Sequence, residues 1–128
     1  MPKRQIIEVP GVAHNAPIPM AVKIGNTVYS SGIIGADPAT GEIPEDAAAQ
    51  TQFMFQHIGT IMEQAGGSTA DIAHMTVYVK DNSTRQLINA EWLKMFPDEN
   101  DRPARHAIRT DELQRGMLIQ CEIVAVLD

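Results

Sequence analysis

Two polar residues near the end of the chain, Arg105 and Gln120, are of the types that can hold a small organic acid and a water molecule. A guanidinium presents a rigid fork of donors that matches a carboxylate, and a carboxamide oxygen accepts a hydrogen bond from water. Both residues stand in segments of alternating apolar and polar residues, which predict strands. If these strands are neighbours, the two side chains project toward one ligand. The alternative for Arg105 is a pair with a nearby carboxylate or a place on a solvated edge.

The elements that position these residues follow from apolar periodicity and from turn-forming residues. Gly25-Asn26 is a two-residue turn of the hairpin type, flanked by β-branched segments. In chain order we expect strands at 6–9, 21–24 and 27–32, a helix at 47–65, a strand at 72–80, a helix at 84–96, and strands at 104–109 and 117–126 joined by a turn at 114–116.

The first expected helix has one apolar face and is preceded by Glu45 and Asp46, which suit the positive end of a helix dipole. The apolar face consists of residues at three- and four-residue steps: Thr51, Met54, Phe55, Ile58, Ile61, Met62 and Ala65. Two helices covering one face of a largely antiparallel sheet make an α+β domain, and the length fits a single domain over residues 1–128.

Composition excludes several classes of function. The formal charge is −6 and only Lys3 and Arg4 are adjacent basic residues, which disfavours binding to nucleic acid or anionic lipid. No apolar run is long enough to cross a membrane and none follows Lys3 and Arg4 as in a signal peptide, so we expect a cytoplasmic protein. The lone Cys121 is expected to be buried and inert, and the 4 histidines have no metal-ligand spacing.

Four segments in this order resemble the reactive intermediate deaminase family, also called RidA or YjgF: Ser30-Ser31-Gly32, Asn89-Ala90-Glu91-Trp92, Pro103-Ala104-Arg105 and the segment from Gln120 to Val126. The resemblance implies the fold of barrel-forming (bacillus-type) chorismate mutase. It also implies a homotrimer with ligand sites in the clefts between subunits. The sequence itself offers no cofactor-binding motif, so we expect a reaction without a cofactor.

The resemblance also implies roles for individual residues. Arg105 would hold the substrate carboxylate, while the backbone of Ala107 and of Ser31-Gly32 would line the pocket. For Ser31 the alternative is a hydroxyl satisfied by local backbone. Asn89 is interpreted as structural, capping or bridging backbone, and His106 should point away from the face that carries Arg105.

The chain departs from the family at two places. Gln120 stands where deaminating members usually carry a glutamate, and a carboxamide cannot take up a proton near neutral pH. Glu122 is expected on the same strand face and could supply the base. Ile18 stands where the family often has a tyrosine, and Ile18 and Ile33 would either make the pocket more apolar or belong to the core.

The leading hypothesis is therefore a hydrolytic deaminase of a small 2-imino or enamine carboxylic acid such as 2-aminoacrylate, with Arg105 and Gln120 as its central residues. One alternative is a deaminase of a longer unsaturated amino acid such as 2-aminomuconate. The other is a non-catalytic trimer that binds a small carboxylate-bearing ligand. The acidic balance argues against the ribonuclease role attached to some family members.

Overall fold

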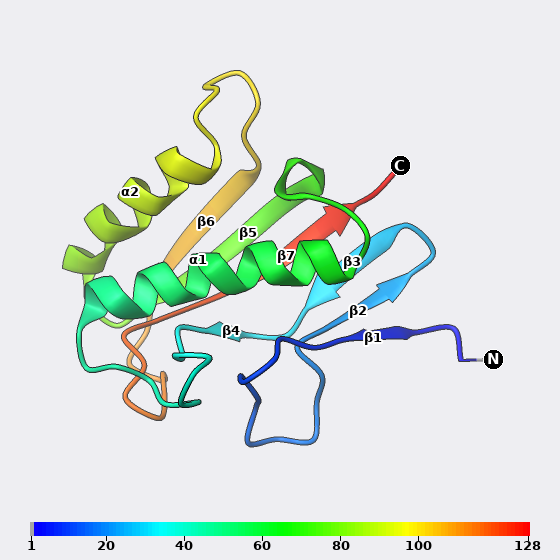
Figure 1. The fold of residues 1–128 in the computed structure, drawn as a ribbon. Helices are drawn as coiled ribbons and strands as arrows, with labels where there is room; N and C mark the ends of the chain where they lie inside the picture. The colour runs from blue at the N-terminus through cyan, green and yellow to red at the C-terminus, as the bar shows by residue number, and fades with distance from the viewer. Residues whose placement is uncertain (1) are drawn as a thin grey trace.

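The computed structural model describes residues 2–128 as one mixed sheet with two helices packed on the same face (Figure 1). The 7-stranded sheet has the order β1-β2-β3-β7-β5-β6, with β4 also paired to β7. The strands are β1 (Gln5–Ile7), β2 (Ala21–Ile24), β3 (Thr27–Ser30), β4 (Ile33–Ile34), β5 (Ile72–Val79), β6 (Ala104–Arg109) and β7 (Ile119–Val126). All the pairings are antiparallel except that of β5 with β6. The α+β prediction is confirmed.

The two helices are α1 (Ala47–Gln64) and α2 (Arg85–Met95), close to the predicted bounds. Asp46 caps α1 by accepting a hydrogen bond from the backbone N–H of Ala49 at 3.1 Å. All the residues predicted for the apolar face of the first helix are buried in the core. Asp81 caps the 3₁₀ turn that precedes α2, and the N-cap residue of α2 itself, Thr84, makes no side-chain cap.

The connection between β5 and β6 corrects one expectation. We expected the strands at 104–109 and 117–126 to be neighbours, but β5 lies between them. The chain leaves β5, runs back through α2 and enters β6 parallel to β5, which is a βαβ crossover. Residues 110–118 then carry the chain past the end of β5 to β7 (Figure 1).

The ends of the sheet also differ in detail from the prediction. The first strand is shorter than residues 6–9, because Val9 leaves the sheet and bridges Val12. The hairpin turns at Gly25 as predicted, with a φ of 59° that glycine tolerates. Beyond it, the segment predicted as one strand to Gly32 ends at Ser30, and Ile33–Ile34 form the separate short strand β4.

The sheet face opposite the helices is partly apolar and uncovered. Strand register places Ile6, Val22, Tyr29 and Val124 in one row across β1, β2, β3 and β7. Ile6 is 56% exposed and Tyr29 is 52% exposed, and Val126 nearby is 48% exposed. We call this surface the open face. An apolar sheet face of this kind is typical of a surface that is covered in an assembly.

His57 joins α1 to the segment after β4 inside the core. Its side chain is 1% exposed, and its Nε2–H donates to the carbonyl oxygen of Ala36 at 2.6 Å. The other ring nitrogen, Nδ1, is buried and has no hydrogen-bond partner among the described residues. Burial lowers the pKa of His57, although the hydrogen bond to Ala36 and the charge of Asp37 oppose this effect.

This lowered pKa makes stability depend on pH. The unfolded histidine has a pKa of about 6.5 and binds a proton more readily than the folded one, so the stabilising contribution is full above about pH 6.5 and falls as the pH drops. His57→Gln keeps a donor to Ala36 but cannot titrate. The urea midpoint of this variant should fall less than that of the wild type between about pH 7.5 and pH 5, at a cost of about 1 kcal/mol at the higher pH.

His106→Gln at an exposed position is the control, and it should keep the wild-type pH dependence. Burial also lowers the pKa of His14, so part of the pH dependence should remain in His57→Gln. An identical decline in wild type and His57→Gln would contradict the assignment.

Candidate functional site

Arg105 lies on the edge strand β6 and points toward α2. Its Cα is in register with that of Met75, a core residue under the helices, so both side chains lie on the helix-covered face. The Arg105 guanidinium is stacked 4.8 Å from the ring centre of Trp92, and its Nη2 donates to Oδ1 of Asn89 at 2.7 Å. A ring face and a side-chain acceptor therefore hold this cation in one orientation.

No carboxylate neutralises Arg105 among the described residues. The ion pairs there are Lys94 with Glu91 and Arg109 with Asp111. Partial burial lowers the pKa of Arg105, and the positive charge of Arg85 lowers it further. Of the two alternatives left open by the sequence, pairing with a nearby carboxylate is therefore not seen, whereas a place on a solvated edge agrees with the exposed position of Arg105 on the edge strand β6.

Asn89 has a different role from the one predicted. We expected it to cap or bridge backbone, but its side-chain oxygen accepts from Arg105 instead. Because residues 85, 89 and 92 follow at steps of four and three, they share one helical face that looks toward β6. Asn89 is thus a positioning residue for Arg105.

The outer edge of β6 is free. The N–H of Thr110 donates to the carbonyl of Val79 on β5 at 2.9 Å. Backbone groups alternate in direction along a strand, so Ala104, His106 and Ile108 also face β5. Ala107 therefore presents its N–H and C=O at the open edge of the sheet, beside Arg105. This agrees with a backbone contribution of Ala107 to a ligand site.

Gln120 lies near the start of β7, on the face away from the helices. It lines a hollow of about 220 Å³ together with Tyr78, Thr110, Glu112 and Leu113. Its carboxamide packs so closely on Gly32 that a Cβ built on that glycine would lie 1.7 Å from Nε2 of Gln120. Only glycine at position 32 leaves room for the observed side chain.

Gln50 on α1 fixes the segment that leads to Gln120. Its side chain is fully buried, donates to the carbonyls of Pro44 and Gly116, and accepts from the N–H of Leu118 at 2.8 Å. All the hydrogen-bonding groups of this amide are engaged at both ends. The sequence pattern gave no indication of Gln50, because a glutamine at the start of a helix is usually exposed.

The other predicted site residues are distributed as follows. Glu122 lies on the same face as Gln120, as expected, and accepts a hydrogen bond from the Tyr78 hydroxyl at 3.2 Å. The Ser31 hydroxyl donates to the carbonyl of Pro19 at 2.7 Å, so it is satisfied by backbone. Ile18 is exposed in the preceding loop. Ile33 is 0% exposed and belongs to the core, so of the two places predicted for it the core is observed and the pocket is wrong.

Arg105 and Gln120 do not meet within one chain. They lie on opposite faces of the sheet, on strands separated by β5. The expectation that both project from neighbouring strands toward one ligand is therefore wrong for the isolated subunit. Sequence reasoning also missed Glu112, which lines the same hollow as Gln120 although it follows the end of β6 by three positions.

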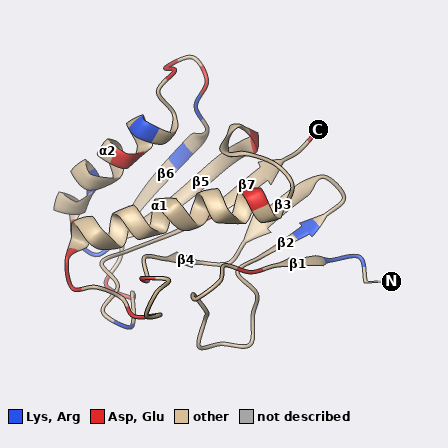
Figure 2. Ribbon diagram, viewed as in Figure 1, with Lys and Arg blue, Asp and Glu red and all other residues tan. Residues whose placement is uncertain are grey.

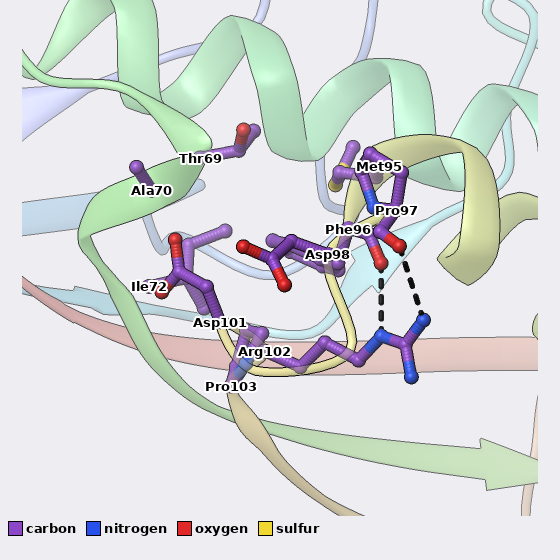
Figure 3. A pocket seen from close by; sticks show the side chains of 10 residues that line it. All are labelled: Thr69, Ala70, Ile72, Met95, Phe96, Pro97, Asp98, Asp101, Arg102 and Pro103. Carbon is purple, nitrogen blue, oxygen red and sulfur yellow. Dashed lines mark hydrogen bonds between the residues drawn. The ribbon is translucent and has the colours of Figure 1, made fainter.

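A larger hollow of about 290 Å³ lies between α2, the segment 97–103 and the start of β5 (Figure 3). It contains none of the predicted site residues. Figure 3 shows the carboxylates of Asp98 and Asp101 beside it, and the Arg102 side chain extended toward the carbonyls of Phe96 and Pro97, to which it donates at 2.9 and 3.4 Å. The arginine that lines this hollow is therefore already hydrogen-bonded to backbone, and the acidic side chains beside the hollow would repel the carboxylate of a ligand.

Charged residues are scattered over loops and several elements, and the basic ones form no continuous stripe in the view of Figure 2. In residues 2–128, His, Cys, Asp and Glu side chains do not gather in groups of three that could hold a metal ion. None of the helices in that range is both long and apolar enough to span a bilayer.

Cys121 is fully buried, as predicted, and burial raises the pKa of its thiol.

The fold and the site define a class: an α+β domain whose antiparallel sheet is extended by one βαβ unit, with an unpaired arginine on the edge strand of that unit. The family described as Endoribonuclease L-PSP matches residues 4–127. The chain belongs to this family, which is also known as the RidA or YjgF family.

Individual relatives are similar over most of their length. The chain is 38% identical over 112 residues to a RutC family protein of Haemophilus influenzae, covering 86% of both chains. It is 35% identical over 111 residues to the 2-iminobutanoate/2-iminopropanoate deaminase of Escherichia coli, covering 86% of this chain and 87% of that enzyme. The crystal structure of RidA from an Antarctic Psychrobacter superimposes with a TM-score of 0.88 at 34% identity, over 97% of this chain and 100% of that one.

The geometry of Arg105 leads to a prediction about ligand binding. Arg105→Lys should keep the fold but weaken the binding of pyruvate by about 2 to 5 kcal/mol, because an ammonium cannot reproduce the planar fork that Trp92 and Asn89 orient. NMR titration of the purified protein measures this loss. Arg109→Lys on the same strand, where the arginine is already paired with Asp111, is the control and should bind as the wild type does. Equal affinities in all three proteins would refute the role of Arg105.

Proposed function

We propose that this protein is a cofactor-free hydrolytic deaminase of small 2-imino or enamine carboxylic acids. The observation that carries the proposal is the guanidinium of Arg105, which is oriented by Trp92 and Asn89 and has no anionic partner among residues 2–128. The activity named for the Escherichia coli relative, on 2-iminobutanoate and 2-iminopropanoate, supports a substrate of this class.

The complete site would form between two subunits of a homotrimer. Arg105 and Gln120 lie on opposite faces of one chain, so they can serve one ligand only if they come from different copies. The exposed apolar residues of the open face, Ile6, Tyr29 and Val126 among them, suit burial against a second copy. Three sheets packed by their open faces would give the barrel found in bacillus-type chorismate mutase.

In this arrangement Arg105 and the N–H of Ala107 in one subunit would bind the substrate carboxylate. The carboxamide of Gln120 in the next subunit would hold a water molecule near the imine carbon. Addition of that water to the C=N bond gives a tetrahedral carbinolamine, and its collapse expels ammonia and leaves the keto acid. The imine carbon is already electrophilic, so positioning provides most of the catalysis.

A base is available in spite of the glutamine at position 120. Glu112 lines the same hollow as Gln120, and Glu122 is linked by a hydrogen bond to Tyr78, which also lines it. Either carboxylate could accept the proton that water loses. Both belong to the subunit that carries Gln120.

The proposal is tested by generating 2-iminobutanoate with an amino acid oxidase and timing its disappearance. Purified protein should accelerate the loss severalfold or more over the spontaneous reaction and release ammonia in equal amount, and Arg105→Lys should abolish most of the gain. An unchanged decay in the presence of wild-type protein would refute the enzyme and favour the alternative of a non-catalytic ligand-binding trimer.

The assembly is tested by light scattering coupled to gel filtration. The mass should be about three times the 14.0 kDa of one chain. Val126→Asp should lower it, because a carboxylate buried in an apolar interface costs several kcal/mol. Leu93→Asp, at a similarly exposed apolar position on α2, is the matched control and should leave the trimer intact. A wild-type mass of one chain at micromolar concentration would rule out the site between subunits.

Gln120→Glu tests whether the glutamine is only a weakened base. The variant places a second carboxylate in the hollow that holds Glu112, and like charges there should oppose an anionic substrate. We expect KM for 2-iminobutanoate to rise about tenfold or more without a gain in kcat. A gain in kcat of up to about 10²-fold would show instead that the chain is a weakened general imine deaminase.

A further inference from the structure

Arg85 lies one helical turn from the residue that orients Arg105. It is the first residue of α2, and Asn89, the acceptor for Arg105, follows four positions later. Side chains four apart on a helix have Cβ atoms about 5 to 6 Å from each other on the same face. Arg85, Asn89 and Trp92 therefore form one stripe on α2 that looks toward the free-edge strand β6.

Arg85 is also free to bind an anion. The structure gives it one hydrogen bond, from Nε–H to Oδ1 of Asn82 at 3.2 Å. Its terminal Nη groups have no partner among the described residues, and it belongs to neither of the ion pairs found there. Arg85 thus carries a second guanidinium without an anionic partner among the described residues, and its positive charge acts on Arg105, where it contributes to the lowered pKa.

Two neighbouring guanidiniums repel each other unless an anion lies between or across them. The chain as a whole is acidic, with a formal charge of −6, and this charge disfavours the binding of a dianion at most places on its surface. Preference for a dianion therefore requires a local positive site, and the edge between α2 and β6 provides one. The other cation of α2, Lys94, lies nine positions from Arg85, on the opposite side of the helix, and is paired with Glu91.

We propose that Arg85 forms a second carboxylate subsite near Arg105, so that the preferred substrate is an imino or enamine dicarboxylic acid. This inference rests on the proposed function and narrows its substrate class. Arg105 fixes the carboxylate next to the reacting carbon, and Arg85 binds the distal one. Because Arg85 lies one helical turn, about 5 Å, from the Asn89 that holds Arg105, we expect a chain of about four to six carbon atoms between the carboxylates.

Binding of unreactive acids tests this subsite without requiring turnover. Glutarate and pentanoate have the same number of carbons and differ in the second carboxylate. Isothermal titration or NMR should show that the wild-type protein binds glutarate about tenfold or more tightly than pentanoate. Arg85→Gln should lose that ratio, and Lys94→Gln, which removes one positive charge from the other side of α2, should keep it.

Equal affinity of the wild type for the two acids would overturn the proposal, as would an unchanged ratio in Arg85→Gln or an equal loss in Lys94→Gln. The failure is distinguishable from failure of the proposed function. If 2-iminobutanoate is hydrolysed but glutarate is not preferred, the deaminase function is supported and the dicarboxylate subsite is refuted. If glutarate is preferred but no imine is hydrolysed, the subsite stands in a binding protein.

Discussion

The one-sided covering of the sheet is the constraint on which the rest of the molecule depends. Both helices pack on one face of the sheet (Figure 1), and alternate residues of β5 and β7 are buried in the core. Polar residues on alternate positions must then fall on the other face, together with exposed apolar residues such as Tyr29. One subunit buries only the sheet face that its helices cover. The strand alternation that builds this core therefore also places the two parts of the proposed site on opposite faces of the sheet.

The second determinant is the βαβ unit at the sheet edge. The chain passes from β5 through α2 into β6, which runs parallel to β5. The face of α2 that carries Trp92 therefore lies over β6, and the Trp92 ring stacks on the Arg105 guanidinium. Phe96 packs against Trp92 with 4.7 Å between ring centres and braces that support from the core. The arginine is thus pre-oriented by packing before any ligand arrives, which reduces the entropy that binding must otherwise remove.

Local patterns predicted most elements because their causes are local. The periodicity of α1, the turn at Gly25 and the alternation of β7 are each contained within a few residues. The order of strands is not local, since insertion of β5 between β6 and β7 depends on the crossover that α2 makes. This is why adjacency of Arg105 and Gln120 was predicted wrongly while their strands were predicted correctly.

Residue roles followed the same division. The burial of Cys121 and the opposite orientation of His106 follow from alternation alone. The contact of Asn89 with Arg105 and the place of Glu112 beside Gln120 arise from segments far apart in sequence or from an irregular connection, and no periodicity signals them. The family resemblance supplied the importance of Arg105, and the structure supplied the groups that orient it.

The buried thiol of Cys121 gives the molecule an internal reporter of opening. This cysteine is the sole one in the chain and sits in β7, which is paired with β3, β4 and β5. Its side chain lies in the core between the sheet and the helices, so a thiol reagent can reach it only after this packing opens, and burial raises the pKa of the thiol, which disfavours the reactive thiolate. The rate of alkylation therefore follows opening of the core under the helices rather than fraying at the edges of the sheet.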